Sequence, residues 1–190
     1  MIETIGTLLT AVGLGVGAGV NAWATFLVFG LLSRLYPAMF SGTLAEFFSS
    51  TPVLVVVAVL YVIEFLADKF PLIDHAWDAV HTFIRPLAGA LIGFAASSNE
   101  VPPELTVLAS VLGGGAALGS HLTKSAIRAT STATTGGMAN PAISIFEDVF
   151  AVLQALLAVF LPYLFLALAV IVIVGLAIWL GSGRPGRAVS

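Results

Sequence analysis

The chain has 190 residues, of which 59% are hydrophobic and only 9% are charged. Soluble domains carry about 25% charged residues, so this composition and a mean hydropathy of +1.08 indicate an integral membrane protein. The net charge of −3 and the lack of a basic run exclude a nucleic-acid-binding protein, and the absence of cysteine excludes disulfides and thiolate chemistry. The start Met1-Ile2-Glu3 has no basic n-region, so no cleaved signal peptide is expected.

The first predicted span is the apolar stretch 4–36. A straight helix of that length would be about 50 Å long, whereas the hydrocarbon core of a bilayer is about 30 Å thick. This segment must therefore tilt, break or re-enter, and its central glycines mark the expected place. The second span begins at Pro52, and the third covers residues 74–96.

The fourth predicted span starts near residue 105 and reaches about Arg128, after a proline-containing break at 97–104. The stretch 130–137 is rich in Thr, Ser and Gly and is expected to be a polar connection. Residues 142–181 are too long for one crossing, and Pro162 divides them because proline suits the start of a helix. The fold prediction is an all-α, polytopic transmembrane helical bundle of about six spans, forming one integral membrane domain.

The distribution of charge in the connections predicts the orientation. Arg184 and Arg187 lie in the tail 182–190, whereas the loop 97–104 holds two acids and no base. The positive-inside rule then places the C-terminus in the cytoplasm. With six spans, the N-terminus is predicted to be cytoplasmic as well.

A short internal repeat relates the two halves of the chain, 1–97 and 105–181, at an offset of 100 residues. The matching pairs are Gly13 and Gly113, Gly15 and Gly115, Gly19 and Gly119, Asn21 and His121, and Thr25 and Ser125. Three spans per half predict a 3+3 inverted repeat with glycine-broken helices, as in many secondary transporters. The alternative is that the small residues only let helices pack closely.

Ionisable residues form stripes inside the predicted spans. Asp74, Asp78, His81 and Arg85 fall within an arc of about 60° on one helical face. Each charge at mid-bilayer costs about 2.5–3.5 kcal/mol, so these side chains must face one another or water. They form either a structural ion-pair cluster that locks helices together or a polar pathway.

The residues predicted to line an ion or substrate pathway share a polar side chain within or beside a span. They are Asn21, Glu64, Asp68, Asp74, Asp78, His81, Arg85, His121, Lys124, Arg128, Thr134, Thr135, Asn140, Glu147 and Asp148. No cofactor is expected, but a metal ion is one candidate cargo, with Asp78, His81, Glu147 and Asp148 as its ligands. The Thr/Ser/Gly stretch could direct backbone N–H groups at an anion or carbonyls at a cation, or simply cap a helix.

Several of these residues lie in distinctive motifs. These are Glu64-Phe65-Leu66-Ala67-Asp68-Lys69, Trp77-Asp78-Ala79-Val80-His81-Thr82-Phe83-Ile84-Arg85-Pro86, Thr134-Thr135-Gly136-Gly137 and Asn140-Pro141. Together they resemble a family of small bacterial inner-membrane proteins known as a domain of unknown function. The resemblance implies a location in the bacterial inner membrane, but it does not indicate an activity. The first motif is also similar to the Glu-x-Gly-Asp-Lys motif of cation/proton exchangers, but it is one residue longer and has Ala67 in place of glycine.

The pattern predicts a small secondary transporter of an ion or charged solute, with proton-coupled transport of a metal cation as one form. An anion or phospholipid headgroup held by Arg85, Lys124 and Arg128 is the alternative cargo. An intramembrane lipid enzyme and a structural membrane protein remain open, although no HExxH or GxSxG motif occurs. The expected partners are the lipid bilayer and further copies of the chain.

Overall fold

The computed structural model describes residues 1–69, 71–97 and 99–182, with the backbone alone for residues 71–78 and 182. Within these ranges the chain forms eight helices and no strand: α1 (Ile2–Val20), α2 (Ala22–Leu35), α3 (Thr43–Ser49), α4 (Thr51–Ala67), α5 (Pro71–Ser97), α6 (Pro103–Thr135), α7 (Asn140–Phe160) and α8 (Pro162–Ser182). Five described helices are long and apolar enough to cross a membrane, or six if the bent pair α3–α4 is one span. The predicted all-α, multi-span bundle is therefore confirmed.

The first apolar stretch breaks into a helical hairpin at Asn21. This residue has an extended backbone, and its side-chain oxygen accepts a hydrogen bond from the Ala24 N–H, which caps α2. The beginning of α1 and the end of α2 lie at the same end of the bundle. There the Ile2 carbonyl accepts a hydrogen bond from Tyr163, and the Tyr36 ring contacts Phe160 with centroids 5.8 Å apart.

The tip of this hairpin lies inside the bundle rather than beyond it. Asn21 donates a hydrogen bond to Asp148, and Asp148 follows the first residue of α7 by eight positions, which is about 12 Å of helix. Since α7 has 21 residues and so spans about 30 Å, the hairpin enters from one end and stops short of the other. Of the possibilities that its length raised, the structure shows a break, with the chain turning back inside the bundle.

The glycines of α1 are helical and serve close packing. A Cβ atom on Gly15 would lie 2.2 Å from the carbonyl oxygen of Gly113, and one on Gly19 would lie 2.1 Å from that of Ala117. Gly113 also approaches Gly89 of α5, where an added Cβ would lie 2.5 Å from the Gly89 carbonyl oxygen. Small residues thus let α1, α5 and α6 approach one another at backbone distance.

Two of the three matching glycines of the second half, Gly115 and Gly119, do not share this role. α6 is continuous over its 33 residues, so the break predicted after the second glycine run is absent. Gly115 and Gly119 have no other described atom within 4 Å of an added Cβ. Val16 and Val20 of α1 accept hydrogen bonds from Ser120 and Lys124 of α6, respectively. The two glycine segments therefore run in the same direction, whereas the inverted layout predicted opposite directions.

The Thr/Ser/Gly stretch is also helical for most of its length, so the predicted polar loop is wrong over 130–135. The hydroxyl groups bond to carbonyls one turn earlier: Thr134 to Thr130 at 2.8 Å and Thr135 to Ser131 at 2.7 Å. Such back-bonding satisfies the hydroxyls within the helix. The chain turns only at Gly136, which has a positive φ of 62° and ends α6 in the left-handed conformation that glycine favours.

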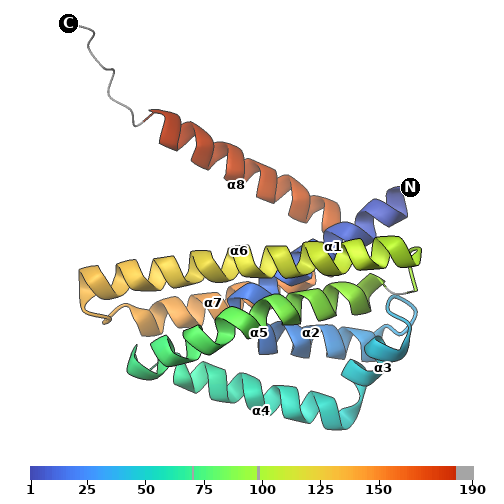
Figure 1. The fold of residues 1–190 in the computed structure, drawn as a ribbon, viewed down its shortest axis with the longest axis horizontal. Coiled ribbons are helices and arrows are strands. Elements are labelled where there is room, and N and C mark those ends of the chain that lie inside the picture. The colour runs from blue at the N-terminus through green and yellow to red at the C-terminus, as the bar shows by residue number, and fades with distance from the viewer. Residues whose placement is uncertain (70, 98, 183–190) are drawn as a thin grey trace, which may run out of the picture.

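Two peripheral parts complete the bundle. The Phe26 and Phe48 rings stack with centroids 4.8 Å apart and join α2 to α3, and α4 leads from there back along α2. α8 is apolar on all sides, and only 6% of its most apolar stretch is buried against the rest of the protein. Figure 1 shows α6 along the whole bundle and α8 pointing away from it. The apolar surface of α8 is compatible with surrounding lipid.

Candidate functional site: a buried ion cluster at the hairpin tip

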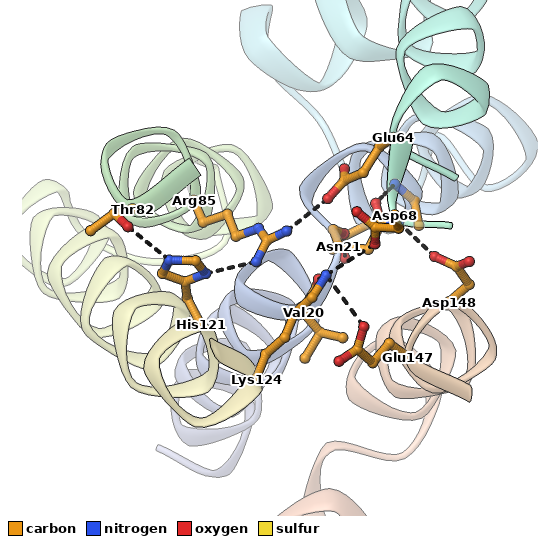
Figure 2. A network of polar contacts seen from close by, with 12 residues as sticks. Val20, Asn21, Glu64, Asp68, Thr82, Arg85, His121, Lys124, Glu147 and Asp148 are labelled. Atoms are coloured by element: carbon orange, nitrogen blue, oxygen red, sulfur yellow. Dashed lines mark hydrogen bonds and ion pairs between the residues drawn. The ribbon is translucent and has the colours of Figure 1, made fainter. Parts of the chain in front are cut away.

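Polar side chains from α4, α5, α6 and α7 converge on Asn21 at the tip of the α1–α2 hairpin. We call this set the buried ion cluster. It comprises Asn21, Glu64, Asp68, Arg85, His121, Lys124, Arg128, Glu147 and Asp148, each at most 8% exposed. Figure 2 shows the carboxylates of Glu64, Asp68 and Asp148 around Asn21, with Arg85 and Lys124 reaching toward them. Nine residues predicted from the sequence are therefore brought together in one place.

Arg85 forms one centre of the cluster. Its Nη2 donates to Glu64 Oε1 at 2.8 Å, and both side chains are fully buried. Its Nη1 lies 2.6 Å from Nδ1 of His121, whose Nε2 lies 3.0 Å from the Thr82 hydroxyl. Because guanidinium has only donors, Nδ1 must accept. His121 is therefore a neutral imidazole that donates its Nε2–H to Thr82.

Lys124 and Arg128 form the second centre, one turn apart on α6. Lys124 Nζ lies 3.4 Å from both Asp68 Oδ2 and Glu147 Oε2. Arg128 donates to Asp68 Oδ2 at 3.0 Å and makes a two-pronged contact with Glu147 through Nε and Nη2. Two bases and two acids thus join α4, α6 and α7 by charge-assisted hydrogen bonds.

Asp148 and the hairpin tip form the third centre. Asn21 Nδ2 donates to Asp148 Oδ1 at 2.8 Å. Lys69, just after α4, lies 3.9 Å from Asp148 Oδ2 and donates to the Ser144 hydroxyl at 2.8 Å. The chain break is thereby attached directly to a buried carboxylate.

The break also brings the two ends of a divided helix into the cluster. The carbonyl of Val20, at the C-terminal end of α1, accepts a hydrogen bond from Lys124 at 3.0 Å. The N-terminal end of α2 begins at Asn21, beside Asp148. A helix carries partial negative charge at its C-terminus and positive charge at its N-terminus. Each end therefore faces a side chain of complementary charge.

Together with Lys69 beside it, the cluster is balanced in charge, but it is not balanced in hydrogen bonds. Glu64, Asp68, Glu147 and Asp148 oppose Arg85, Lys124, Arg128 and the partly exposed Lys69. Nevertheless, three buried oxygens, Glu64 Oε2, Asp68 Oδ1 and Asp148 Oδ2, have no hydrogen-bond donor among the described side chains. An unsatisfied buried acceptor costs about 1–3 kcal/mol. These oxygens are positions where a proton, a water molecule or a cation would be stabilised.

Three of the predicted metal ligands, His81, Glu147 and Asp148, have described side chains, and these three are not gathered into one cage. Glu147 is engaged by Arg128 and Lys124, whereas the adjacent Asp148 faces Asn21. His81 lies against Trp23, with ring centroids 6.4 Å apart in an edge-on arrangement. Among the side chains that the structure describes, no group of three or more His, Asp or Glu is placed to hold a metal ion.

Other predicted pathway residues lie at various distances from the cluster. Thr134 and Thr135 are exposed near the end of α6 and do not join it. Asn140 is buried but bonds to Thr132 at 3.0 Å, closing the α6–α7 turn. The side chains of Asp74 and Asp78, on the first turns of α5, lie outside the described residues.

Sequence reasoning did not assign a site role to three groups that contact the cluster. They are the Val20 carbonyl, the Lys69 ammonium and the Thr82 hydroxyl, and Lys69 in turn donates a hydrogen bond to the Ser144 hydroxyl. The signal for the first was present, because a helix that ends at Asn21 leaves its last carbonyls without intrahelical donors. Ser144 precedes Asp148 by one helical turn, so the two lie on the same face of α7.

Two cavities flank α7 and reach the cluster from opposite sides. A cavity of about 660 Å³ between α1, α6 and α7 has Lys124 and Glu147 in its lining. A second, of about 270 Å³ between α4 and α7, has Tyr61 and Asp148 in its lining. Consecutive acids on one helix are thus reached from two different cavities.

The chain belongs to the family described as Domain of unknown function (DUF4126), whose model matches residues 8–182. The predicted resemblance to an uncharacterised family is thereby confirmed. No curated protein and no solved structure matches the chain.

Proposed function

We propose that this DUF4126 protein is a small secondary membrane transporter that moves protons through the buried ion cluster, coupled to a small charged solute. The observation that carries the proposal is the α1–α2 hairpin, whose broken tip meets buried carboxylates with oxygens that lack a donor among the described residues. Broken helices at mid-membrane form the substrate sites of many secondary transporters. Intramembrane ionisable groups are by default candidates for proton relays.

The mechanism follows from the contacts of Asp148. When this carboxylate takes up a proton, it loses its charge, and its attraction to Lys69 falls while Asn21 can still donate to Oδ1. The proton would satisfy the oxygen that lacks a donor among the described side chains. Asp148 therefore links protonation to the contacts that hold the hairpin tip.

A proton fits the described geometry better than the other predicted cargoes. A resident metal ion would need at least three ligands around one point, and the described side chains offer no such group. Arg85, Lys124 and Arg128 each contact a carboxylate, whereas three carboxylate oxygens lack a donor among the described residues, and this favours a positively charged cargo over an anion. The hydroxyls of Thr134 and Thr135, which were candidates for anion binding, bond to their own helix.

We also propose an orientation in the bacterial inner membrane. The re-entrant hairpin replaces the first crossing, so the chain makes five crossings and its termini lie on opposite sides. The end with the 97–104 loop carries Glu100 and Glu104 and faces outward by the positive-inside rule. The C-terminus is then cytoplasmic, whereas the N-terminus is outside, and the homo-oligomer stays a prediction.

Proton flux into liposomes containing the purified protein tests this function. A potassium diffusion potential drives protons inward, and a trapped pH-sensitive dye records the flux. Asp148→Asn should reduce the flux to the level of empty liposomes, because an amide keeps an oxygen for Asn21 but cannot take up a proton. Gln154→Leu is the matched control: Gln154 is buried on the same helix and bonds to the Gly13 carbonyl, away from the cluster. Equal flux in wild type and Asp148→Asn would refute the proposal.

The second candidate function is purely structural, since the same ion pairs join α4, α5, α6 and α7. Exchanging the charges of Glu64 and Arg85, which pair directly with each other, separates the two. If the cluster only locks helices, the double exchange should restore both folding and cellular function. If it conducts protons, folding should recover while flux remains absent.

A further inference from the structure

The larger of the two cavities beside α7 is a groove that the ion cluster alone does not explain. It has a volume of about 660 Å³ and is lined by apolar side chains of α1, α6 and α7, including Val16, Ile127 and Phe150. Ligand sites of this kind have volumes of about 300–1,000 Å³ and mostly apolar walls with a few polar groups.

The groove opens toward the lipid rather than toward water. Its rim includes Ile127 and Phe146, which are 51% and 69% exposed. The α7 residues that line it lie between Ala142 and Phe150, within about 15 Å of the start of that helix. An occupant therefore enters sideways from the membrane leaflet at the α6–α7 turn.

The more exposed of the two charged groups in the groove lining is a carboxylate. The side chain of Glu147 is 10% exposed, whereas that of Lys124 is 2% exposed, so the acid is more accessible than the base beside it. The rings of Phe146 and Phe150 flank Glu147 on α7 and stack with centroids 6.4 Å apart. Aromatic faces beside a carboxylate are a setting that attracts an organic cation.

We infer that this groove binds a lipophilic organic cation, an amine or onium group carried on apolar substituents, as the solute that is coupled to protons. The coupling of this cation to protons rests on the proposed function, whereas its binding rests on the groove alone. The apolar part lies against Val16, Ile127 and Phe150, and the charge lies next to Glu147. Binding there competes with Arg128 and Lys124 for the carboxylate and so acts directly on the cluster.

Two probes of the same shape and opposite charge test the charge selectivity. Equilibrium dialysis of the full-length purified protein in mild detergent should show saturable binding of tetraphenylphosphonium. Tetraphenylborate, its anionic counterpart, should bind at least tenfold more weakly. Equal binding of the two ions, or tighter binding of the borate, would overturn the inference.

Two tryptophan substitutions test the location. Ala142→Trp fills the groove and should weaken tetraphenylphosphonium binding at least tenfold, whereas Ala126→Trp, at an exposed position of α6 outside the groove lining, should leave it unchanged. Glu147→Gln should also weaken tetraphenylphosphonium binding. If the Glu147→Gln protein does not fold, the Ala142→Trp protein still provides the test of location. Absent binding, or binding insensitive to Ala142→Trp, would overturn this inference, while the proton flux of wild type and Asp148→Asn would still decide the proposed function separately.

Discussion

The ion pair between Glu64 and Arg85 gives the sharpest prediction of stability. Both side chains are fully buried and their charged atoms lie 2.8 Å apart. Replacing one partner of such a pair leaves an uncompensated buried charge, which typically costs about 3–5 kcal/mol. Arg85→Met also removes the donor to His121, so we expect a loss at the upper end of that range. Such a loss is a third or more of a typical folding free energy of about 5–15 kcal/mol.

The double variant is the decisive measurement. Replacing both Glu64 and Arg85 by methionine removes the pair together with its desolvation cost, and such exchanges are often neutral or stabilising. Unfolding of the purified proteins by SDS, followed by circular dichroism, should therefore show a double variant more stable than either single variant. The coupling energy from the cycle should exceed about 2 kcal/mol. If the two single effects simply add, within about 0.5 kcal/mol, the pair does not interact as described and the reasoning fails.

Two further predictions concern packing and topology. Gly19→Val should destabilise the protein by about 1–3 kcal/mol, because its Cβ would lie 1.9 Å from the Ser120 hydroxyl; Gly119→Val, at the matching open position, should be neutral in the same SDS assay. The natural chain has no cysteine, so single cysteines at Glu3, Met39 and Met138 can be labelled with a membrane-impermeant thiol reagent. The first two should react from the same side and the third from the opposite side, and labelling of Glu3 and Met39 positions from opposite sides would rule out the re-entrant hairpin.

Much of the cluster could be predicted from energetics alone. Charges such as Arg85 and Arg128 within apolar helices are too costly to face lipid, so they had to converge, and the structure places both at buried ion pairs. Their partners could not be predicted, because a helical face does not specify which helix it meets. Glu147 and Asp148 show this. They are neighbours in the sequence and point about 100° apart on α7, yet each pairs with a different base and lines a different cavity.

The glycine runs were harder to interpret for a physical reason. Glycine both weakens a helix and lets two helices approach closely, and the sequence does not show which effect dominates. In α1 packing against Gly113 dominates, and the break falls at Asn21, where the side chain can cap the next helix. The Thr-rich end of α6 was predicted to be a loop for a similar reason. Its hydroxyl groups can bond either to a ligand or to the carbonyls of their own helix, and the composition does not show which.

The location of the ion pairs argues that they do more than hold helices together. α1, α5 and α6 already pack at backbone distance through Gly15, Gly89 and Gly113, and that contact needs no charge. Apolar residues in place of the buried ion pairs would join the same helices at no loss of stability, and often with a gain. The charges are instead concentrated where a helix is broken and where two cavities reach consecutive acids. A cluster that only stabilised the fold would not need either feature, whereas the proposed path for protons and a charged solute would use both.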